Sequence, residues 1–103
     1  MENTYKLVFD SVILKQFKKL GKQKPVREML SKMLDKIEEL GPLAGKIIDS
    51  KLALFEVKAK RPPIRLYYKI IEERKEAYVF EYEMKTSQER QDRTIEKIRL
   101  KMG

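Results

Sequence analysis

The segment Leu54-Phe55-Glu56-Val57-Lys58-Ala59-Lys60-Arg61-Pro62-Pro63-Ile64-Arg65-Leu66-Tyr67-Tyr68-Lys69-Ile70 decides the fold of this 103-residue chain. Apolar and polar residues alternate on both sides of a basic, proline-stiffened turn, which predicts a hairpin of two strands. Side chains point alternately to the two faces of a strand, so the first strand presents Glu56, Lys58 and Lys60 together. The second presents Arg65, Tyr67 and Lys69 on one face and Ile64, Leu66, Tyr68 and Ile70 on the other. Such a cationic strand pair could bind a phosphate chain, although lysines also protect edge strands from aggregation.

The rest of the chain surrounds this hairpin with helices and further strands. Periodicity predicts strands at 5–9 and 76–84, helices at 11–20, 25–40 and from 87 onward, and a connector at 43–51. The hairpin strands are expected at about 52–59 and 64–71. We therefore predict one α+β domain over residues 1–103: an N-terminal strand, a helical hairpin, a three-stranded antiparallel meander and a C-terminal helix. Strict alternation in the last strand is expected to place Tyr82 with Tyr78 and Phe80, opposite Glu81 and Glu83.

Composition narrows the chemistry that this chain can perform. It carries 24 Lys and Arg against 16 Asp and Glu, a formal charge of +8. An anionic partner such as nucleic acid or an acidic protein is favoured, with a solubilising surface as the alternative. Cysteine and histidine are absent, which excludes thiol chemistry, histidine bases and the usual zinc ligands, and we expect neither metal nor cofactor. No apolar run approaches the roughly 18 residues of a membrane span, so a cytoplasmic protein is expected.

Two regions outside the hairpin carry candidate functional groups. The C-terminal helix should present a cationic stripe opposite its apolar stripe, formed by Arg90, Arg93, Lys97 and Lys101. This stripe is as consistent with a solvated helix face as with nucleic-acid contact. Residues 81–86 join the last strand to that helix. Tyr82 there could act on a bound ligand or belong to the core, whereas Glu81 and Glu83 are only a weak indication of a paired-carboxylate site.

Two short motifs are shared with a known family. Leu54-Phe55-Glu56-Val57-Lys58 followed by Arg65-Leu66-Tyr67-Tyr68 fits a Leu-Tyr/Phe-Glu-Leu/Val-Arg/Lys strand followed by Arg-x-x-Tyr. The chain thereby resembles the RelE/ParE superfamily of bacterial and archaeal toxins. Tyr82-Glu83-Met84-Lys85-Thr86-Ser87-Gln88 is similar to the HigB-like branch of that superfamily. The chain departs from the family where Arg61-Pro62-Pro63-Ile64 replaces the usual Gly-Asp-Tyr before the arginine, and where the terminal Arg-to-Tyr motif of the RelE branch is missing.

The resemblance implies the toxin of a type II toxin–antitoxin system, an endoribonuclease that cleaves messenger RNA on the ribosome and is silenced by a cognate antitoxin. In the implied reaction a base deprotonates the ribose 2′-OH, and the oxygen attacks the adjacent phosphate. Cations then stabilise the added charge, and an acid protonates the leaving 5′ oxygen. The superfamily alternative is a ParE-like toxin that inhibits gyrase. An alternative of another class is a nucleic-acid-binding module without catalytic activity.

Residue roles follow from this resemblance and from the chemistry of the side chains. Arg65 is expected to bind the scissile phosphate, because the planar guanidinium suits bidentate phosphate contacts. Lys58, Lys60 or Glu56 would supply the base, and Tyr82 or Lys85 the acid. The residues expected to contact RNA are Arg61, Arg90, Arg93, Lys97 and Lys101. The antitoxin is expected to cover the sheet face with acidic or amphipathic segments.

Overall fold

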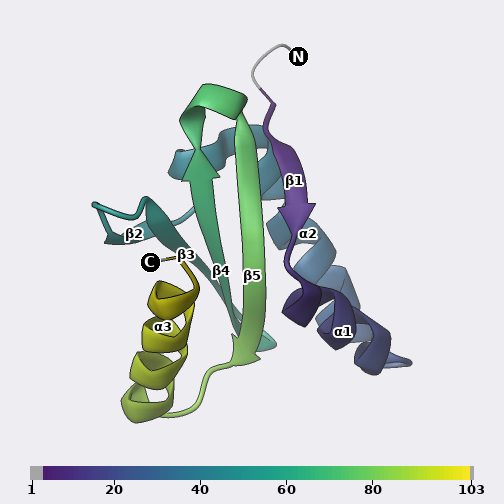
Figure 1. Ribbon diagram of the computed structural model, residues 1–103. Helices are drawn as coiled ribbons and strands as arrows, with labels where there is room; N and C mark the ends of the chain where they lie inside the picture. The colour runs from purple at the N-terminus through teal and green to yellow at the C-terminus, as the bar shows by residue number, and fades with distance from the viewer. Residues whose placement is uncertain (1–3, 103) are drawn as a thin grey trace.

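A computed structural model describes residues 4–102 as one sheet with helices on both of its faces (Figure 1). The helices are α1 (Ser11–Leu20), α2 (Lys24–Leu40) and α3 (Gln88–Met102), with single 3-10 turns at Gly41–Leu43 and Glu72–Arg74. The strands are β1 (Lys6–Phe9), β2 (Lys46–Asp49), β3 (Leu54–Lys60), β4 (Pro63–Ile71) and β5 (Glu76–Met84). They are ordered β1-β5-β4-β3-β2, with β1 parallel to β5 and the other neighbours antiparallel. Among residues 4–102, no helix is long and apolar enough to cross a membrane.

The helical hairpin is defined by residues at the ends of its helices. Asp10 caps α1, its Oδ2 accepting a hydrogen bond from the Val12 backbone N–H at 3.0 Å. Pro25 lies in the first turn of α2, where its missing N–H costs no helical hydrogen bond. Gly41 ends α2 with φ +54°, and a Cβ placed there would overlap the Tyr5 ring. Glycine is therefore required at this position for its backbone conformation and for space.

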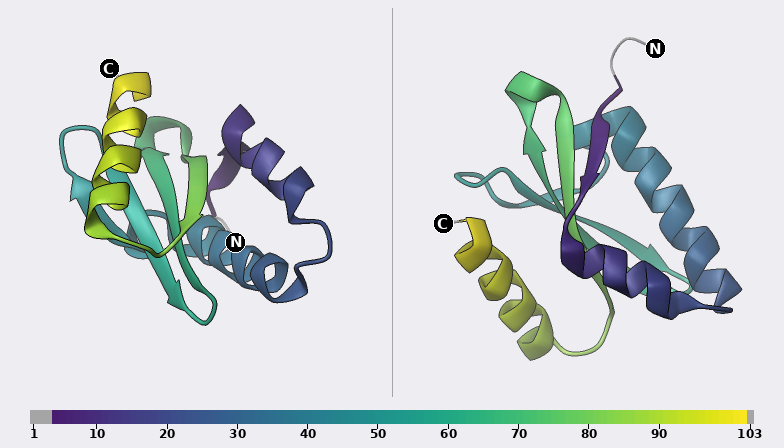
Figure 2. Two further views of the ribbon diagram at one scale, coloured as in Figure 1. Left: turned by 90° about the horizontal axis from the view of Figure 1, so that it is seen from below. Right: turned by 45° about the vertical axis from the view of Figure 1, so that its right-hand side comes forward.

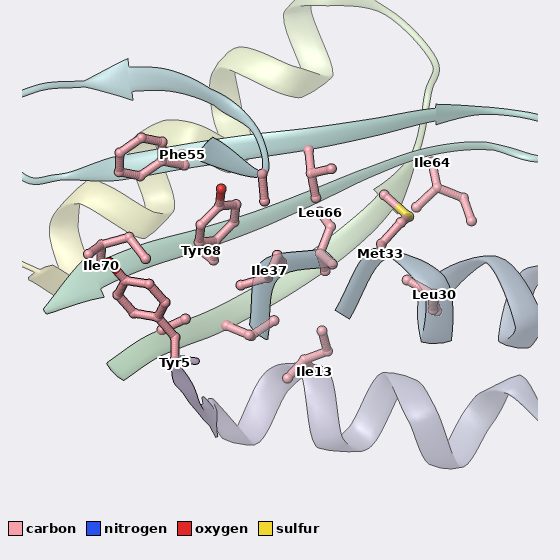
Figure 3. Packing of buried hydrophobic residues seen from close by; sticks show 14 of the residues in the cluster. Tyr5, Ile13, Leu30, Met33, Ile37, Phe55, Ile64, Leu66, Tyr68 and Ile70 are labelled. Carbon is pink, nitrogen blue, oxygen red and sulfur yellow. The ribbon is translucent and has the colours of Figure 1, made fainter. Parts of the chain in front are cut away.

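The face of the sheet beneath α1 and α2 carries the larger core (Figure 3). Ile13 of α1 and Leu30, Met33 and Ile37 of α2 pack against the apolar side chains that β4 projects, including Leu66 and Tyr68. Burying one such side chain contributes roughly 1.5–3 kcal/mol to folding. The assignment of Ile64, Leu66, Tyr68 and Ile70 to one face of β4 is confirmed.

Helix α3 lies on the opposite face of the sheet (Figure 2). The apolar cluster on this face is much smaller. Leu54, Tyr67 and Phe80 of the sheet meet Ile98 of α3, and partly buried side chains surround them. Ser87 precedes the helix, and its Oγ accepts a hydrogen bond from the Arg90 N–H at 3.2 Å, as expected of an N-terminal cap. Because the apolar contact is small, polar side chains form much of the remaining contact between α3 and the sheet.

The predicted α+β class and order of elements are confirmed, but the connector at 43–51 contains a strand that sequence analysis missed. In β2, Lys46 pairs with Glu56 and Ile47 with Phe55, and a register shift follows before Asp49 pairs with Leu54. Only four residues form the strand, and Ile47 is exposed. So short a segment with an irregular register gives almost no alternation to detect.

The expected alternation in β5 is wrong beyond Phe80. Tyr67 pairs with Glu81 and Tyr68 with Val79, so Phe80 is an extra residue and β5 carries a bulge. Tyr78 and Phe80 lie in the α3 cluster, whereas Tyr82 packs against the α1/α2 core. A bulge shifts every later side chain to the opposite face, which is why the period-two pattern misplaced Tyr82.

Candidate functional site

The β3–β4 register brings the cationic and acidic side chains of the hairpin together on the α3 side. Lys58 pairs with Arg65, and Glu56 pairs with Tyr67. Glu56 is 5% exposed, and its Oε2 accepts hydrogen bonds from Arg65 Nη1 at 2.8 Å and from Gln91 Nε2 of α3 at 2.9 Å. Arg65 is thus an arginine whose charge is balanced by a buried carboxylate.

A solvent-open cavity of about 400 Å³ lies beside this ion pair, and we call it the Glu56 cavity. Its lining residues come from β2, β3, β4 and α3: Lys46, Ile47, Ile48, Glu56, Lys58, Arg65, Gln88, Gln91 and Ile95. Within residues 4–102, both hydrogen bonds that Glu56 receives end on Oε2, so Oε1 remains available to a ligand. Arg65 also has N–H groups that can donate to a ligand, because a guanidinium carries five N–H groups and the bond to Glu56 uses one of them.

Two more carboxylates, both on β5, lie next to this pair. Glu83 accepts hydrogen bonds from the Tyr67 hydroxyl at 2.7 Å and from the Thr94 hydroxyl at 2.6 Å. Burial, reinforced by the bond to Glu83, raises the pKa of Tyr67, so its hydroxyl remains a donor at neutral pH. Glu81 accepts a bond from Lys97 Nζ at 3.1 Å, and within the described residues its buried Oε2 has no partner.

Helix α3 is therefore attached to the sheet through a row of polar contacts. Gln91, Thr94 and Lys97 follow one another at intervals of three residues, which places them on one face of the helix. Each contacts a different sheet carboxylate: Glu56, Glu83 and Glu81 respectively. The cationic stripe expected on α3 is consequently not a uniformly solvated face.

A second cavity, of about 430 Å³, lies on the other side of this row. It is lined by Gln16, Glu81, Tyr82, Glu83, Met84, Arg90, Arg93, Thr94 and Lys97. Burial raises the pKa of Tyr82 here, and Gln16 holds the Tyr82 backbone through both its N–H and its carbonyl. Arg90 and Arg93 are exposed, so they give this cavity a cationic rim above its acidic floor.

Comparison with known proteins identifies the family. No protein-family model matches the sequence, and no similar protein is found among curated sequences. Among solved structures, a chain of the intact E. coli RelBE toxin–antitoxin complex is 30% identical, with a TM-score of 0.64 over 81% of this chain and 99% of that one. This chain belongs to the RelE toxin family.

Two further structures share the fold of this chain. A double arginine-to-alanine mutant of the E. coli toxin RelE in the free state is 26% identical, with a TM-score of 0.70 over 92% of this chain and 98% of that one. A RelBE toxin–antitoxin complex from Mycobacterium tuberculosis is 18% identical, with a TM-score of 0.54, and supports the fold alone. The resemblance drawn from the hairpin motifs is thereby confirmed.

Only part of the set of site residues predicted for this RelE family member converges. Glu56, Lys58 and Arg65 line the Glu56 cavity, whereas Tyr82 lines the second cavity and Lys85 lines neither. Lys60 and Arg61 are exposed around the β3–β4 turn.

The predicted RNA-binding cations of α3 also separate into two groups. Arg90, Arg93 and Lys97 line the second cavity, while Lys101 donates to Asp10 Oδ2 at 3.0 Å, away from both cavities. The site residues predicted from the sequence do not include Tyr67, Gln91 or Thr94. The three-residue spacing of Gln91 and Thr94 on α3 is the one signal that the sequence offers for them, and it does not reveal the carboxylates that they contact.

Proposed function

We propose that this chain is the toxin of a type II toxin–antitoxin system and that it cleaves messenger RNA on the ribosome without a metal. The observation that carries the proposal is the convergence of Glu56, Arg65 and Lys58 around one open cavity in a RelE family member. A carboxylate supplies a base, and two cations supply charge stabilisation, which together meet the needs of 2′-OH attack on a phosphate.

Glu56 is the general base in this mechanism. Arg65 and Gln91 fix the carboxylate through Oε2, so Oε1 can accept the proton of the ribose 2′-OH. Arg65 uses one N–H on Glu56 and directs its remaining donors to the scissile phosphate. The other two bases predicted from sequence are Lys58 and Lys60. Both are exposed, so neither has an orientation fixed as that of Glu56 is.

Lys58 is the proposed proton donor to the leaving 5′ oxygen. It pairs with Arg65 across the hairpin and lines the same cavity, so its ammonium group can reach a phosphate held by Arg65. Tyr82 and Lys85, the acids predicted from sequence, do not line this cavity, so they could contact only a substrate that extends beyond it.

We propose a separate role for Arg90, Arg93 and Lys97, which is to contact RNA away from the scissile bond.

Matched substitutions of two carboxylates test this assignment. Glu56→Gln and Glu83→Gln each remove one negative charge on the α3 side with little change of shape, from a buried position at Glu56 and from a partly buried one at Glu83. Only Glu56→Gln should lower single-turnover cleavage of ribosome-bound messenger RNA, by roughly 10²–10⁴-fold, and abolish the acid limb of the pH profile. Equal losses in both variants, or an unchanged profile shape in Glu56→Gln, would exclude Glu56 as the base.

Arg65→Ala tests the phosphate contact separately. It should lose most cleavage and most growth arrest, because the transition-state charge loses its bidentate donor. A folded Arg65→Ala protein with wild-type activity would contradict the proposal. Absence of ribosomal cleavage by the wild type, combined with a gyrase-linked DNA-damage response, would instead identify a ParE-like activity.

An antitoxin is the proposed partner. Two similar structures are complexes that contain an antitoxin, and this chain carries a charge of +8 that an acidic partner would neutralise. Co-expression of the product of the adjacent gene should restore growth and abolish cleavage. If the chain arrests growth equally with and without that product, the proposed pairing is wrong.

A further inference from the structure

A groove between α2 and β3 carries a concentration of positive charge that the proposed chemistry does not use. It encloses about 260 Å³ and is lined by Met29, Lys32, Met33 and Lys36 of α2 and by Val57, Lys58, Ala59 and Lys60 of β3. Its four lysines are all exposed and stand beside two methionines, a valine and an alanine. We call it the four-lysine groove.

The described part of the chain does not compensate the charge in this groove. No acidic side chain lines it, and within residues 4–102 no carboxylate lies within 4 Å of any of its four lysine ammonium groups. On each element the two lysines repeat at a similar spacing, roughly 6 Å for four residues of helix and roughly 7 Å for two residues of strand. Lys58 and Lys60 alternate with the core-facing Val57 and Ala59, so they leave β3 on the face opposite to α2. The two rows of like charge therefore lie on either side of residues 57–60, an arrangement that favours an extended polyanion crossing this strand over a single small anion.

The groove follows a stretch of β3 that has a strand partner on one side only. Within residues 4–102, β2 pairs with the first half of β3, through Leu54, Phe55 and Glu56, and residues 57–60 pair with β4 alone. Lys58 lies in this stretch and lines both the groove and the Glu56 cavity. The two depressions are therefore neighbours that share one lysine.

We propose that the four-lysine groove binds the single-stranded RNA segment that flanks the scissile phosphate. The lysines would contact its phosphates, and Met29, which is partly exposed, flexible and polarisable, would provide an apolar surface for a base. The inference rests on the proposed function, since it takes the Glu56 cavity as the place where the strand is cut.

Edge protection and peptide binding account for the four lysines less completely than RNA binding does. Protection of an exposed strand edge suits Lys58 and Lys60, which lie on β3, but leaves Lys32 and Lys36 of α2 unexplained. An acidic peptide strand added to the open edge would also satisfy the charge. RNA is favoured because the groove adjoins the cavity proposed for cleavage and shares Lys58 with it.

Charge reversal on two helices provides a matched test. Lys32→Glu/Lys36→Glu alters the groove, and Lys15→Glu/Lys19→Glu makes the same change at the same helical spacing on α1, outside the groove. All four positions are exposed, and thermal melting would verify that both variants fold. The probe is a fluorescent single-stranded RNA with 2′-O-methyl nucleotides, which prevent attack by the 2′ oxygen, and its binding is measured by anisotropy across salt concentrations.

The groove variant should bind this RNA at least about tenfold more weakly than wild type, and the α1 variant less than about threefold more weakly. The slope of log K against log salt should also fall by about 1.4 in the groove variant, because each phosphate contact on a single strand contributes about 0.7. Equal weakening in both variants, or unchanged binding in the groove variant, would overturn the inference. So would normal RNA binding combined with lost affinity for the antitoxin, which would identify a peptide site.

The binding measurement separates this inference from the cleavage proposal. If wild type binds the RNA through Lys32 and Lys36 but fails to cut messenger RNA on ribosomes, the groove assignment stands and the proposed function fails. If cleavage proceeds with KM and kcat unchanged in the groove variant, the proposed function stands and the groove assignment fails.

Discussion

The two faces of the sheet differ in the polarity of the side chains buried on them. The face under α1 and α2 is almost wholly apolar, with Ile13, Ile37 and Leu66 fully buried in one continuous core. The face under α3 has a small apolar cluster, and its other buried residues are polar: Glu56, Glu81, Gln91 and Thr94. Burying carboxylates costs free energy that an apolar contact does not, even when they are hydrogen-bonded. We infer that the first face stabilises the domain and that the second is organised around the proposed cleavage site.

The largest expected effect is on the apolar face. Ile37→Ala removes a fully buried side chain from the α1/α2 core and should lower the free energy of unfolding by about 2–5 kcal/mol. Denaturant unfolding measures the change directly. A loss below about 1 kcal/mol would mean that this face does not carry the stability assigned to it.

Ile98→Ala makes the same truncation on the other face, at an equally buried position of α3. Because α3 is attached by a small cluster and a row of polar contacts, it should open at a lower free energy than the sheet does. Amide exchange should therefore accelerate in α3 and remain nearly unchanged in β4, whereas Ile37→Ala should accelerate exchange throughout. Uniform acceleration in both variants would remove the distinction between the faces.

The two faces also differ in how much of their structure could be predicted from the sequence. The helices, the β3–β4 hairpin and the shared face of Glu56, Lys58 and Arg65 follow from local periodicity, which the sequence displays directly. The bond from Gln91 to Glu56 joins residues 35 positions apart, and no local pattern specifies such a pairing. The bulge at Phe80 could not be predicted from the sequence either, because one extra residue interrupts the alternation without changing the residue types of the strand. The apolar face was therefore predicted well, and the polar face only in part.

An intermediate effect is expected from one hydrogen bond of the polar row. Thr94→Val removes the hydroxyl that donates to Glu83 at 2.6 Å while keeping the side-chain shape. Glu83 keeps the bond from Tyr67, so the loss should be about 1–3 kcal/mol. Thr94→Ser, which retains the hydroxyl, is the control. If both variants unfold at the wild-type denaturant concentration, the polar row does not help to hold α3 on the sheet.

The smallest expected effect concerns Asp10, which links the two faces because it caps α1 and accepts bonds from Tyr78 of β5 and Lys101 of α3. Burial alone would raise the pKa of Asp10, but the hydrogen bonds from the Val12 N–H, Tyr78 and Lys101 outweigh it and lower the pKa below the ordinary value of 3.8. A carboxylate whose pKa is lowered by folding stabilises the protein above its unfolded pKa, and this contribution is lost as the pH falls through the folded pKa. Asp10→Asn should therefore cost about 1 kcal/mol at pH 7, in keeping with a charged group at a helix N-terminus. The difference from wild type should shrink as the pH falls below about 4.

Asp35→Asn, at an exposed position of α2, is the control and should differ little from wild type across the same range. A difference between Asp10→Asn and wild type that stays constant from pH 7 to pH 2 would show that the cap acts by its shape and not by its charge.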